Sequence, residues 1–269
     1  MKIAILGIYI GEYWRFWQAF YLSSEKRLIP DIKKDYYIFS DKQDLLYAEN
    51  ENVHVIFQKN MGWPDNTLMR YQLFLSIEKE LEKYDYIFFC NANLYISKLI
   101  GREILPSDDE KLFFVKRVPS FLFHEEQPYE KNILSTAYVA PGESELYVRG
   151  GFNGGQASHF IEMCHVLNDN ILKDKREGII ALWHDESHIT RYAIDHPESK
   201  ILSPAYLYPE GYVMPYDKKI LVRKKNNEEV RFGTKSPMRN IKRKIKLCMR
   251  NMVYWLLIHL HIIPYLHDL

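Results

Sequence analysis

Short apolar runs and helix-like periods alternate along the first half of this chain. Apolar runs bounded by polar residues are typical of buried strands, whereas apolar residues repeating every three or four positions are typical of amphipathic helices. The pattern predicts strands at residues 3–9, 36–39, 53–57 and 86–90, and helices at residues 13–24 and 68–84. This alternation is the βαβ rhythm of an open, mostly parallel sheet with flanking helices, so we expect an α/β fold.

A glycine-rich string follows in the second half. Strands are expected at residues 111–115 and 145–148, then the string at residues 150–155, then a helix at residues 159–170. The string has neither the spacing nor the position of a dinucleotide-binding loop. A tight chain reversal explains it, and so does a floor without side chains on which a bulky ligand group rests.

Two asparagines, Asn91 and Asn93, end the apolar run 86–90. Ligand sites of α/β proteins lie at such strand ends. Side chains separated by one residue point the same way from an extended backbone, so these two amides are expected to address one ligand. Aspartates here would predict a divalent cation, but amides are weaker, uncharged ligands for a hard cation. We therefore expect a ligand site that works without a metal.

Composition excludes some classes of protein. The net charge of +1 does not favour a protein that coats nucleic acid. Cys90, Cys164 and Cys248 are odd in number and far apart, which predicts a reducing compartment and no disulfide framework. The apolar run at the amino end is short and reads as a first strand, not as a signal peptide, so we expect a cytoplasmic protein.

The carboxyl end is basic and then apolar. No acidic residue interrupts its basic residues, which are Lys235, Arg239, Lys242, Arg243, Lys244, Lys246 and Arg250. The apolar run 252–258 is shorter than the roughly 20 residues of a membrane-spanning helix. Residues 235–269 are therefore expected to form a basic amphipathic tail on an anionic membrane surface. A helix packed on the domain and a nucleic-acid tail are the alternatives.

The second polar cluster is residues 183–188, at the start of an expected helix that runs to Ala193. His184 and His188 share a helix face as zinc ligands do, but the HExxH order and a third ligand are missing. A capped, solvated helix start with Asp185 or Ser187 as N-cap is a second explanation. The crowding of an indole, an imidazole and two carboxylates favours a site that binds and activates a sugar, since a carboxylate beside an anomeric carbon acts as nucleophile or stabilises oxocarbenium charge.

Three strings resemble glycosyltransferase family 6, the family of the ABO blood-group transferases and α1,3-galactosyltransferase: residues 150–155, 183–188 and 202–207. The resemblance covers about residues 3–231 and is to the soluble bacterial members, without a vertebrate membrane anchor and stem. It implies a GT-A type fold with a Rossmann-like, mostly parallel sheet. The implied domain is residues 1–234, with a donor half of about 1–95 and an acceptor half of about 96–234, followed by the tail 235–269.

The resemblance also implies roles for single residues. Glu186 matches the glutamate proposed as nucleophile or as stabiliser of front-side attack, and it also contacts the acceptor. Trp183 matches an indole that stacks on the acceptor. The residues matched to donor contacts are His184, Asp185, Arg70, Tyr13 near the uracil, and Ile8, Tyr9 and Ile10 along the uridine.

Vertebrate members carry Asp-Val-Asp, which holds manganese, where this chain has Asn91-Ala92-Asn93. We therefore expect no divalent metal and no other cofactor, with Asn91 and Asn93 bonded to ribose or sugar hydroxyls. Lys225 and Arg231 align with basic residues of the family's closing C-terminal segment and are expected to offset the charge of the departing diphosphate. A solvated charged edge is the alternative for this mixed run.

Donor choice follows from size. Gly151 aligns with a position where a small residue goes with N-acetylgalactosamine and a larger one with galactose. The expected activity is metal-independent, retaining α1,3 transfer of N-acetylgalactosamine from UDP-GalNAc to a fucosylated β-galactoside, in the cytoplasm at the inner face of a bacterial membrane. The alternatives are galactose transfer from UDP-Gal, a catalytically silent glycan-binding protein, and a zinc hydrolase built on His184 and His188.

Overall fold

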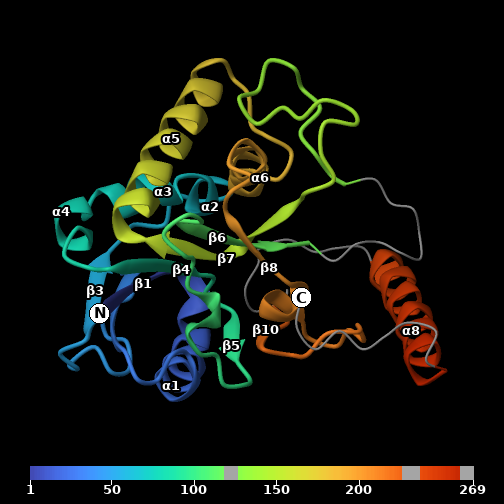
Figure 1. The fold of residues 1–269 in the computed structure, drawn as a ribbon, viewed down its shortest axis with the longest axis horizontal. Coiled ribbons are helices and arrows are strands. Elements are labelled where there is room, and N and C mark those ends of the chain that lie inside the picture. Colours follow the sequence, from blue (N-terminus) through green and yellow to red (C-terminus); the bar gives the residue numbers. More distant parts are fainter. Residues whose placement is uncertain (118–126, 226–236, 261–269) are drawn as a thin grey trace.

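The computed structural model describes residues 1–117, 127–225 and 237–260, and its centre is a seven-stranded sheet (Figure 1). The strand order is β3-β2-β1-β4-β7-β6-β8. All pairs are parallel except those that β7 makes with β4 and β6. The bounds are β1 Lys2–Tyr9, β2 Lys33–Ser40, β3 Val53–Phe57, β4 Tyr86–Cys90, β6 Leu112–Lys116, β7 Val148–Gln156 and β8 Lys200–Leu202.

Helices cover both faces of the sheet (Figure 1). One face carries α2 Asp65–Leu68, α3 Arg70–Leu75, α4 Glu78–Leu81, α5 Ala157–Arg176 and α6 Asp185–Asp195. The other carries the 3-10 helix η1 Gly11–Phe16, α1 Trp17–Arg27, the 3-10 helix η3 Pro204–Leu207, and a small sheet of β5 Leu94–Ile96, β10 Ile220–Val222 and β9 Tyr208–Pro209. A further 3-10 helix, η2, spans Arg102–Ile104.

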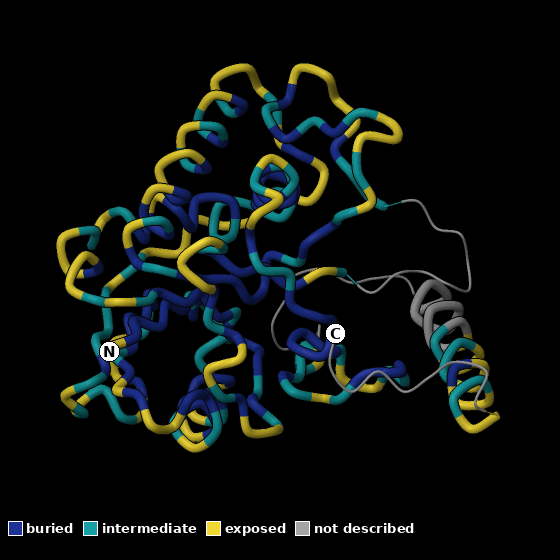
Figure 2. The backbone as a smooth tube through the Cα atoms, in the orientation of Figure 1, coloured by how far each residue is buried: buried dark blue, intermediate teal, exposed yellow. Residues whose placement is uncertain are grey.

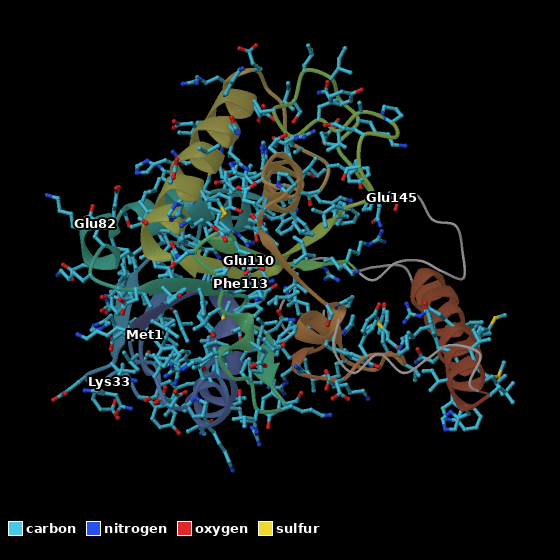
Figure 3. All side chains as sticks on the ribbon, in the orientation of Figure 1. Met1, Lys33, Glu82, Glu110, Phe113 and Glu145 are labelled. Carbon is cyan, nitrogen blue, oxygen red and sulfur yellow. The ribbon has the colours of Figure 1, made fainter. Side chains whose placement is uncertain are left out.

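Two apolar cores lie between these layers, and the backbone at the centre of the sheet is drawn mostly as buried in Figure 2. Along β1, Ile3 and Ile5 enter the core on the α1 side, whereas Ala4 and Leu6 enter the core on the α5 side. This is the period of two that a strand imposes. Phe113 of β6 lies at the centre of the molecule (Figure 3) and is fully buried.

The expected α/β fold with a mostly parallel sheet and flanking helices is confirmed, and it agrees with a GT-A type fold. The strands predicted at 53–57 and 86–90 have the observed bounds. The single helix expected at 68–84 is wrong, because this segment divides into short helices. At the end of α3 the Ser76 hydroxyl donates to the carbonyl of Leu73 at 2.6 Å, a local bond that competes with helix continuation.

The glycine string is neither a reversal nor a loop, which corrects the first expectation for residues 150–155. It lies inside β7, which begins at Val148, where the strand predicted at 145–148 was expected to end. A Cβ on Gly154 would lie 2.5 Å from the carbonyl oxygen of Ile87, so glycine is required for the close approach of β4. Strands β4 and β6 flank β7, so both expected halves share one sheet.

A long helix, α8 Pro237–His259, lies at the edge of the molecule (Figure 1). Its Asn251 side chain accepts from Val213 N at 3.0 Å and donates to Gly211 O at 2.8 Å, and Tyr254 is buried. Among the described residues, no helix has the length and apolarity needed to cross a bilayer. The expected boundary at residue 234 lies outside the described residues.

Candidate active site

An irregularity in β7 shapes the candidate site. Phe114 of β6 pairs with Asn153 of β7, but the next residue of β6, Val115, pairs with Arg149. The antiparallel register therefore skips the β7 residues between 149 and 153. Residues 150–152 therefore bulge from the β6 ladder. Bulges turn backbone groups away from a ladder and are common beside active sites. Here the bulge frees both polar groups of Gly150 to meet side chains from α3 and α6.

Glu186, in the first turn of α6, is held by two donors at this bulge. Gly150 N donates to its Oε2 at 2.9 Å, and the Tyr147 hydroxyl donates to its Oε1 at 3.1 Å. Arg149 Nε lies 3.7 Å from Oε2. Burial and the adjacent Glu186 carboxylate raise the pKa of Tyr147, so the phenol keeps its proton. The carboxylate is thereby fixed in orientation while its side chain stays partly exposed.

Asp185 and Arg70 form a buried ion pair behind this carboxylate. Arg70 Nη2 lies 2.9 Å from Asp185 Oδ2, and Nη1 donates to the carbonyl of Gly150 at 2.7 Å. The guanidinium also lies over the Phe89 ring, 4.3 Å from its centroid. Burial raises the pKa of Asp185 to about 7, opposed by the attraction of Arg70. With 4% of its surface exposed, Arg70 ties α3 to β7 and α6.

His184 is the N-cap residue before α6 and has an unusual backbone conformation, with a φ of 56°. Such conformations in non-glycine residues are costly and collect at functional sites. The imidazole Nδ1 lies 3.2 Å from the carbonyl oxygen of Ala181, and the ring stands edge-on to Trp63 at 4.8 Å. The expected N-cap at Asp185 or Ser187 is wrong, because His184 holds that position and the Ser187 hydroxyl accepts from Trp183 N instead.

Exposed indoles flank this helix start. Trp183 is 52% exposed and Trp63 is 68% exposed. Sequence analysis identified Trp183 but missed Trp63, as it missed Tyr147. Both missed residues adjoin recognisable features: Trp63 lies between a glycine and a proline, and Tyr147 precedes the glycine string. Only the fold shows that Trp63 contacts His184 and that Tyr147 contacts Glu186.

The two histidines at i and i+4 have separate surroundings. His188 is buried, with Nε2 3.8 Å from Asp174 Oδ2 and Nδ1 3.4 Å from Thr136 Oγ1. Burial lowers the pKa of His188 to about 4, against the attraction of Asp174 and Glu130. Within the part of the chain that the structure describes, no three His, Cys, Asp or Glu side chains are grouped as metal ligands. The fold does not bring His184 and His188 to a common zinc position.

The segment expected along the uridine, residues 8–10, spans the carboxyl end of β1. The Tyr9 side chain is fully buried and stands edge-on to Trp17 at 5.5 Å, so it faces the core and not a ligand. Ile10 is also buried, whereas Ile8 and Tyr13 are partly exposed. For Tyr9, the backbone groups are therefore what can meet a nucleotide, and the contact of residues 8–10 with uridine stays a prediction.

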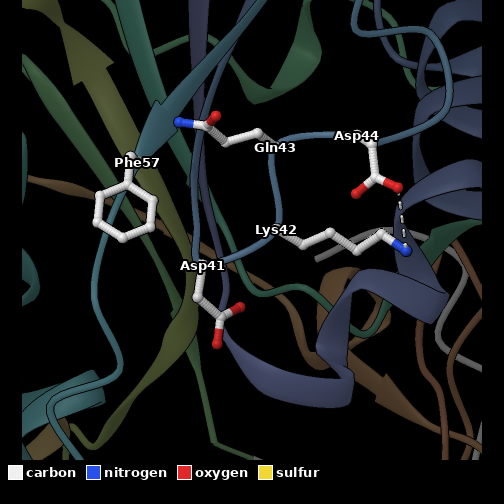
Figure 4. A pocket seen from close by; sticks show the side chains of 5 residues that line it. All are labelled: Asp41, Lys42, Gln43, Asp44 and Phe57. Atoms are coloured by element: carbon white, nitrogen blue, oxygen red, sulfur yellow. Dashed lines mark ion pairs between the residues drawn. The ribbon is translucent and has the colours of Figure 1, made fainter.

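A pocket lies beside this segment, at the carboxyl ends of β2 and β3 (Figure 4). It is lined by Asp41, Lys42, Gln43, Asp44 and Phe57. The Asp41 carboxylate accepts from Gly11 N, with both oxygens at 3.0 Å, and Lys42 Nζ lies 4.2 Å from the Trp14 ring centroid. Two residues that line the pocket therefore contact Gly11 and Trp14, which follow Ile10 in the chain. The sequence pattern did not predict this pocket.

Asn91 and Asn93 have different neighbours. Leu94 N donates to the carbonyl of Asn91 at 3.1 Å, so residues 91–94 form a turn and the alternation of an extended strand does not apply. Asn91 N donates to Gly151 O at 2.9 Å, and a Cβ on Gly151 would lie 3.3 Å from Asn91 Nδ2. Asn93 instead donates its Nδ2 to the carbonyl of Arg223 at 2.7 Å.

Of the two cations expected beside the diphosphate, Lys225 lies among the described residues. Lys225 Nζ lies 4.7 Å from the Tyr13 ring centroid, so the amino-terminal and carboxyl-terminal donor candidates meet. Arg231 lies outside the described residues. The fold therefore brings together two groups: Gly150, Glu186, Asp185, Arg70 and His184 around the bulge, and Asn93, Lys225 and Tyr13 beside the end of β1 and β4.

Comparison with known proteins identifies the family. The model of glycosyltransferase family 6 matches residues 1–232. The chain is similar to the O-antigen biosynthesis glycosyltransferase WbnI of Escherichia coli, at 35% identity over 85% of this chain and 97% of that protein. It is also similar to globoside alpha-1,3-N-acetylgalactosaminyltransferase 1 of Gallus gallus, at 29% over 86% of this chain and 69% of the relative.

A third relative is the histo-blood group ABO system transferase 1 of Rattus norvegicus, 29% identical over 75% of this chain and 59% of the relative. The family match spans all seven strands of the sheet and the bulge with its carboxylates. The chain therefore belongs to glycosyltransferase family 6 and is a glycosyltransferase.

Proposed function

We propose that this protein transfers N-acetylgalactosamine from UDP-GalNAc to the 3-hydroxyl of a fucosylated β-galactoside, with retention of configuration and without a metal ion. The observation that carries the proposal is the Glu186 carboxylate, oriented by Gly150 N and the Tyr147 hydroxyl, with the Asp185 and Arg70 pair directly behind it. A carboxylate fixed in this way suits a reaction that develops positive charge on an anomeric carbon.

The chemistry requires a negative group beside C1 of the donor sugar. As the bond from C1 to the diphosphate oxygen breaks, UDP leaves with the bonding electrons. Glu186 either bonds to C1 and is then displaced by the acceptor hydroxyl, or stabilises the oxocarbenium ion while that hydroxyl attacks from the same side. In both routes the proton of the acceptor hydroxyl passes to an oxygen of the departing diphosphate. Asp185 and His184 hold the donor sugar in this proposal, and the exposed indole of Trp183 stacks on the acceptor.

The side chains at positions 91 and 93 support a reaction without a metal ion. Positions 91 and 93 carry amides, and the Nδ2 of Asn93 is already bonded to a carbonyl. Neither side chain can neutralise a divalent cation. In this proposal Lys225 and Arg231 supply fixed positive charge to the departing diphosphate, and Asn91 bonds a ribose or sugar hydroxyl.

The donor sugar is inferred from the residue at position 151. A Cβ there would lie 3.3 Å from Asn91 Nδ2 and 3.4 Å from Leu207 Cδ2, so glycine allows the close packing of both side chains on the backbone. A small residue at this position goes with N-acetylgalactosamine in the family's pattern, which supports UDP-GalNAc over UDP-Gal. The similarity to a globoside N-acetylgalactosaminyltransferase supports the same donor.

We also propose that the protein acts in the cytoplasm on the inner face of the membrane, held there by residues 235–269. Opposite the side of α8 that carries Asn251 and Tyr254, one apolar stripe is exposed: Ile245 54%, Met249 59%, Met252 57% and Leu256 43%. Its members are spaced three or four residues apart, and the basic residues around them suit anionic lipid headgroups.

The deciding experiment compares UDP-GalNAc and UDP-Gal on a 2′-fucosylgalactoside, each with EDTA and with added manganese. The expected result is faster turnover of UDP-GalNAc, unchanged by EDTA. Strict dependence on manganese would remove the metal-independent mechanism, and faster turnover of UDP-Gal would replace the proposed donor.

A further inference from the structure

Asn93 makes two hydrogen bonds to the backbone of Arg223, one through its side chain and one through its own carbonyl. Its Nδ2 donates to the carbonyl oxygen of Arg223 at 2.7 Å, and its own carbonyl accepts from Arg223 N at 2.8 Å. These bonds join positions 130 residues apart in the sequence. Asn93 is only 2% exposed, and its Oδ1 is buried without a hydrogen-bond partner among the described residues. The side chain thus bonds the protein's own backbone, not the solvent.

Arg223 directly follows β10. Val222, the last residue of β10, pairs with Leu94 of β5, so Asn93 and Arg223 extend this antiparallel pair by one further step. Lys224 N then donates to Glu210 Oε2 at 2.7 Å. Backbone contacts with Asn93 and Glu210 therefore set the direction in which the chain leaves the small sheet.

The chain that leaves the small sheet in this direction places the positive charges of Arg223 and Lys225 near the end of β1. The Arg223 guanidinium lies 5.4 Å from the Phe16 ring centroid, and Lys225 Nζ lies 4.7 Å from the Tyr13 ring centroid. Both rings belong to η1, which directly follows the segment 8–10. Asn93 and Lys225 are thus connected through a short stretch of fixed backbone.

We propose that Asn93 is a positioning residue, which holds the Arg223 backbone so that Lys225 meets the diphosphate of the donor. The inference rests on the proposed use of a UDP-sugar, and it replaces a direct contact between Asn93 and the ligand with an indirect one. It also explains why an amide is needed at position 93. An aspartate offers only acceptors, and its carboxylate would face the Arg223 carbonyl oxygen across a hydrogen-bond distance.

The test is a double-mutant cycle on UDP binding, measured by calorimetry without metal in the full chain. The variants are Asn93→Asp, Asn93→Ala, Lys225→Ala and the two double variants. Asn52→Asp is the matched control, because Asn52 Nδ2 also donates to a backbone carbonyl, that of Lys34, away from the site. We expect Asn93→Asp and Asn93→Ala each to weaken UDP binding about tenfold, and by less than about twofold once Lys225 is alanine. The control should bind UDP as the unmodified protein does.

A second measurement does not depend on the ligand. Hydrogen exchange of peptides covering residues 220–225 should accelerate in both Asn93 variants and stay unchanged in Asn52→Asp. An equal loss of UDP affinity with and without Lys225 would mean that Asn93 contacts the ligand directly and would overturn the inference. Unchanged exchange at 220–225 would overturn it too. Failure of the unmodified protein to bind UDP would refute the proposed function, and with it the role of Asn93 toward a diphosphate.

Discussion

Arg70 and Asp185 form an ion pair at 2.9 Å in which both side chains are at most 5% exposed. The pair connects α3 to the first turn of α6, and the same guanidinium bonds the Gly150 carbonyl that the bulge exposes. Removing one member leaves a buried charge without its counterion, whereas removing both does not. The Glu186 carboxylate is therefore supported by the buried ion pair that lies behind it.

Replacing Arg70 alone should be more damaging than replacing the pair. We expect Arg70→Met to lower the free energy of unfolding by about 3–5 kcal/mol, measured by urea denaturation. Arg70→Met combined with Asp185→Leu should recover most of that loss but not the transferase activity. A double variant less stable than Arg70→Met would contradict the charge-balance explanation.

Glu186→Gln should abolish most transfer while preserving the fold. The amide oxygen can still accept from Gly150 N, but the side chain carries no charge for the developing oxocarbenium ion. We expect turnover to fall on the order of 10²–10³-fold with an unchanged melting temperature. Undiminished turnover would exclude the proposed role of this carboxylate.

Tyr147→Phe tests the orientation of Glu186 separately. Losing one of its two donors should lower turnover by about fivefold, since a single hydrogen bond contributes about 1 kcal/mol. Tyr129→Phe is the matched control, because the Tyr129 hydroxyl donates to the carbonyls of Ser144 and Leu146 and, among the residues that the structure describes, to no carboxylate. Equal losses in the two variants would indicate a structural effect on this loop and not a specific effect on Glu186.

Sequence periodicity predicted the strands whose own side chains form the cores, such as β3 and β4. It could not predict β7, because the glycines of that strand are required by the close approach of β4 and β6 and carry no apolar signal. The site divides in the same way. Trp183 to Glu186 are adjacent in the sequence and could be recognised, whereas Tyr147 is 39 residues from Glu186 and meets it only through the bulge.

The tail shows why periodicity alone leaves its partner undecided. Apolar residues at helical spacing fit a membrane, a second copy or the protein's own surface equally well. The contacts of Asn251 and Tyr254 assign one side of α8 to the protein itself, and the stripe from Ile245 to Leu256 remains exposed.

Acid should destabilise the protein through His188. In the unfolded chain this imidazole takes up a proton near its ordinary pKa of 6.5, whereas burial lowers the pKa in the fold to about 4. Between these values the unfolded state binds more protons, so the free energy of unfolding falls as pH falls from 6.5 toward 4. Above pH 6.5 the contribution is complete. We expect a loss on the order of 3 kcal/mol across this window.

His188→Gln should flatten that part of the stability curve, measured by urea denaturation at a series of pH values. His165→Gln is the control, because His165 is exposed on the neighbouring helix α5 and, within the described residues, its ring bonds to the partly exposed carboxylate of Glu78. A curve for His188→Gln with the same slope as the unmodified protein would show that another group causes the acid sensitivity.

Charge placed on the exposed stripe of α8 should release the protein from anionic vesicles. Met249 and Leu256 are 59% and 43% exposed, so Met249→Glu and Leu256→Glu leave the docked side of the helix intact. Each change removes apolar burial in the bilayer interface and adds repulsion from the headgroups, so the double variant should no longer sediment with the vesicles. Val166→Glu, at a 42% exposed position of α5, should sediment as the unmodified protein does.

Because soluble substrates do not need the membrane, turnover in solution should stay unchanged in all these variants. Vesicle binding that survives both charges would rule out the stripe as the membrane surface, and a change from dimer to monomer would assign it to a second copy of the chain.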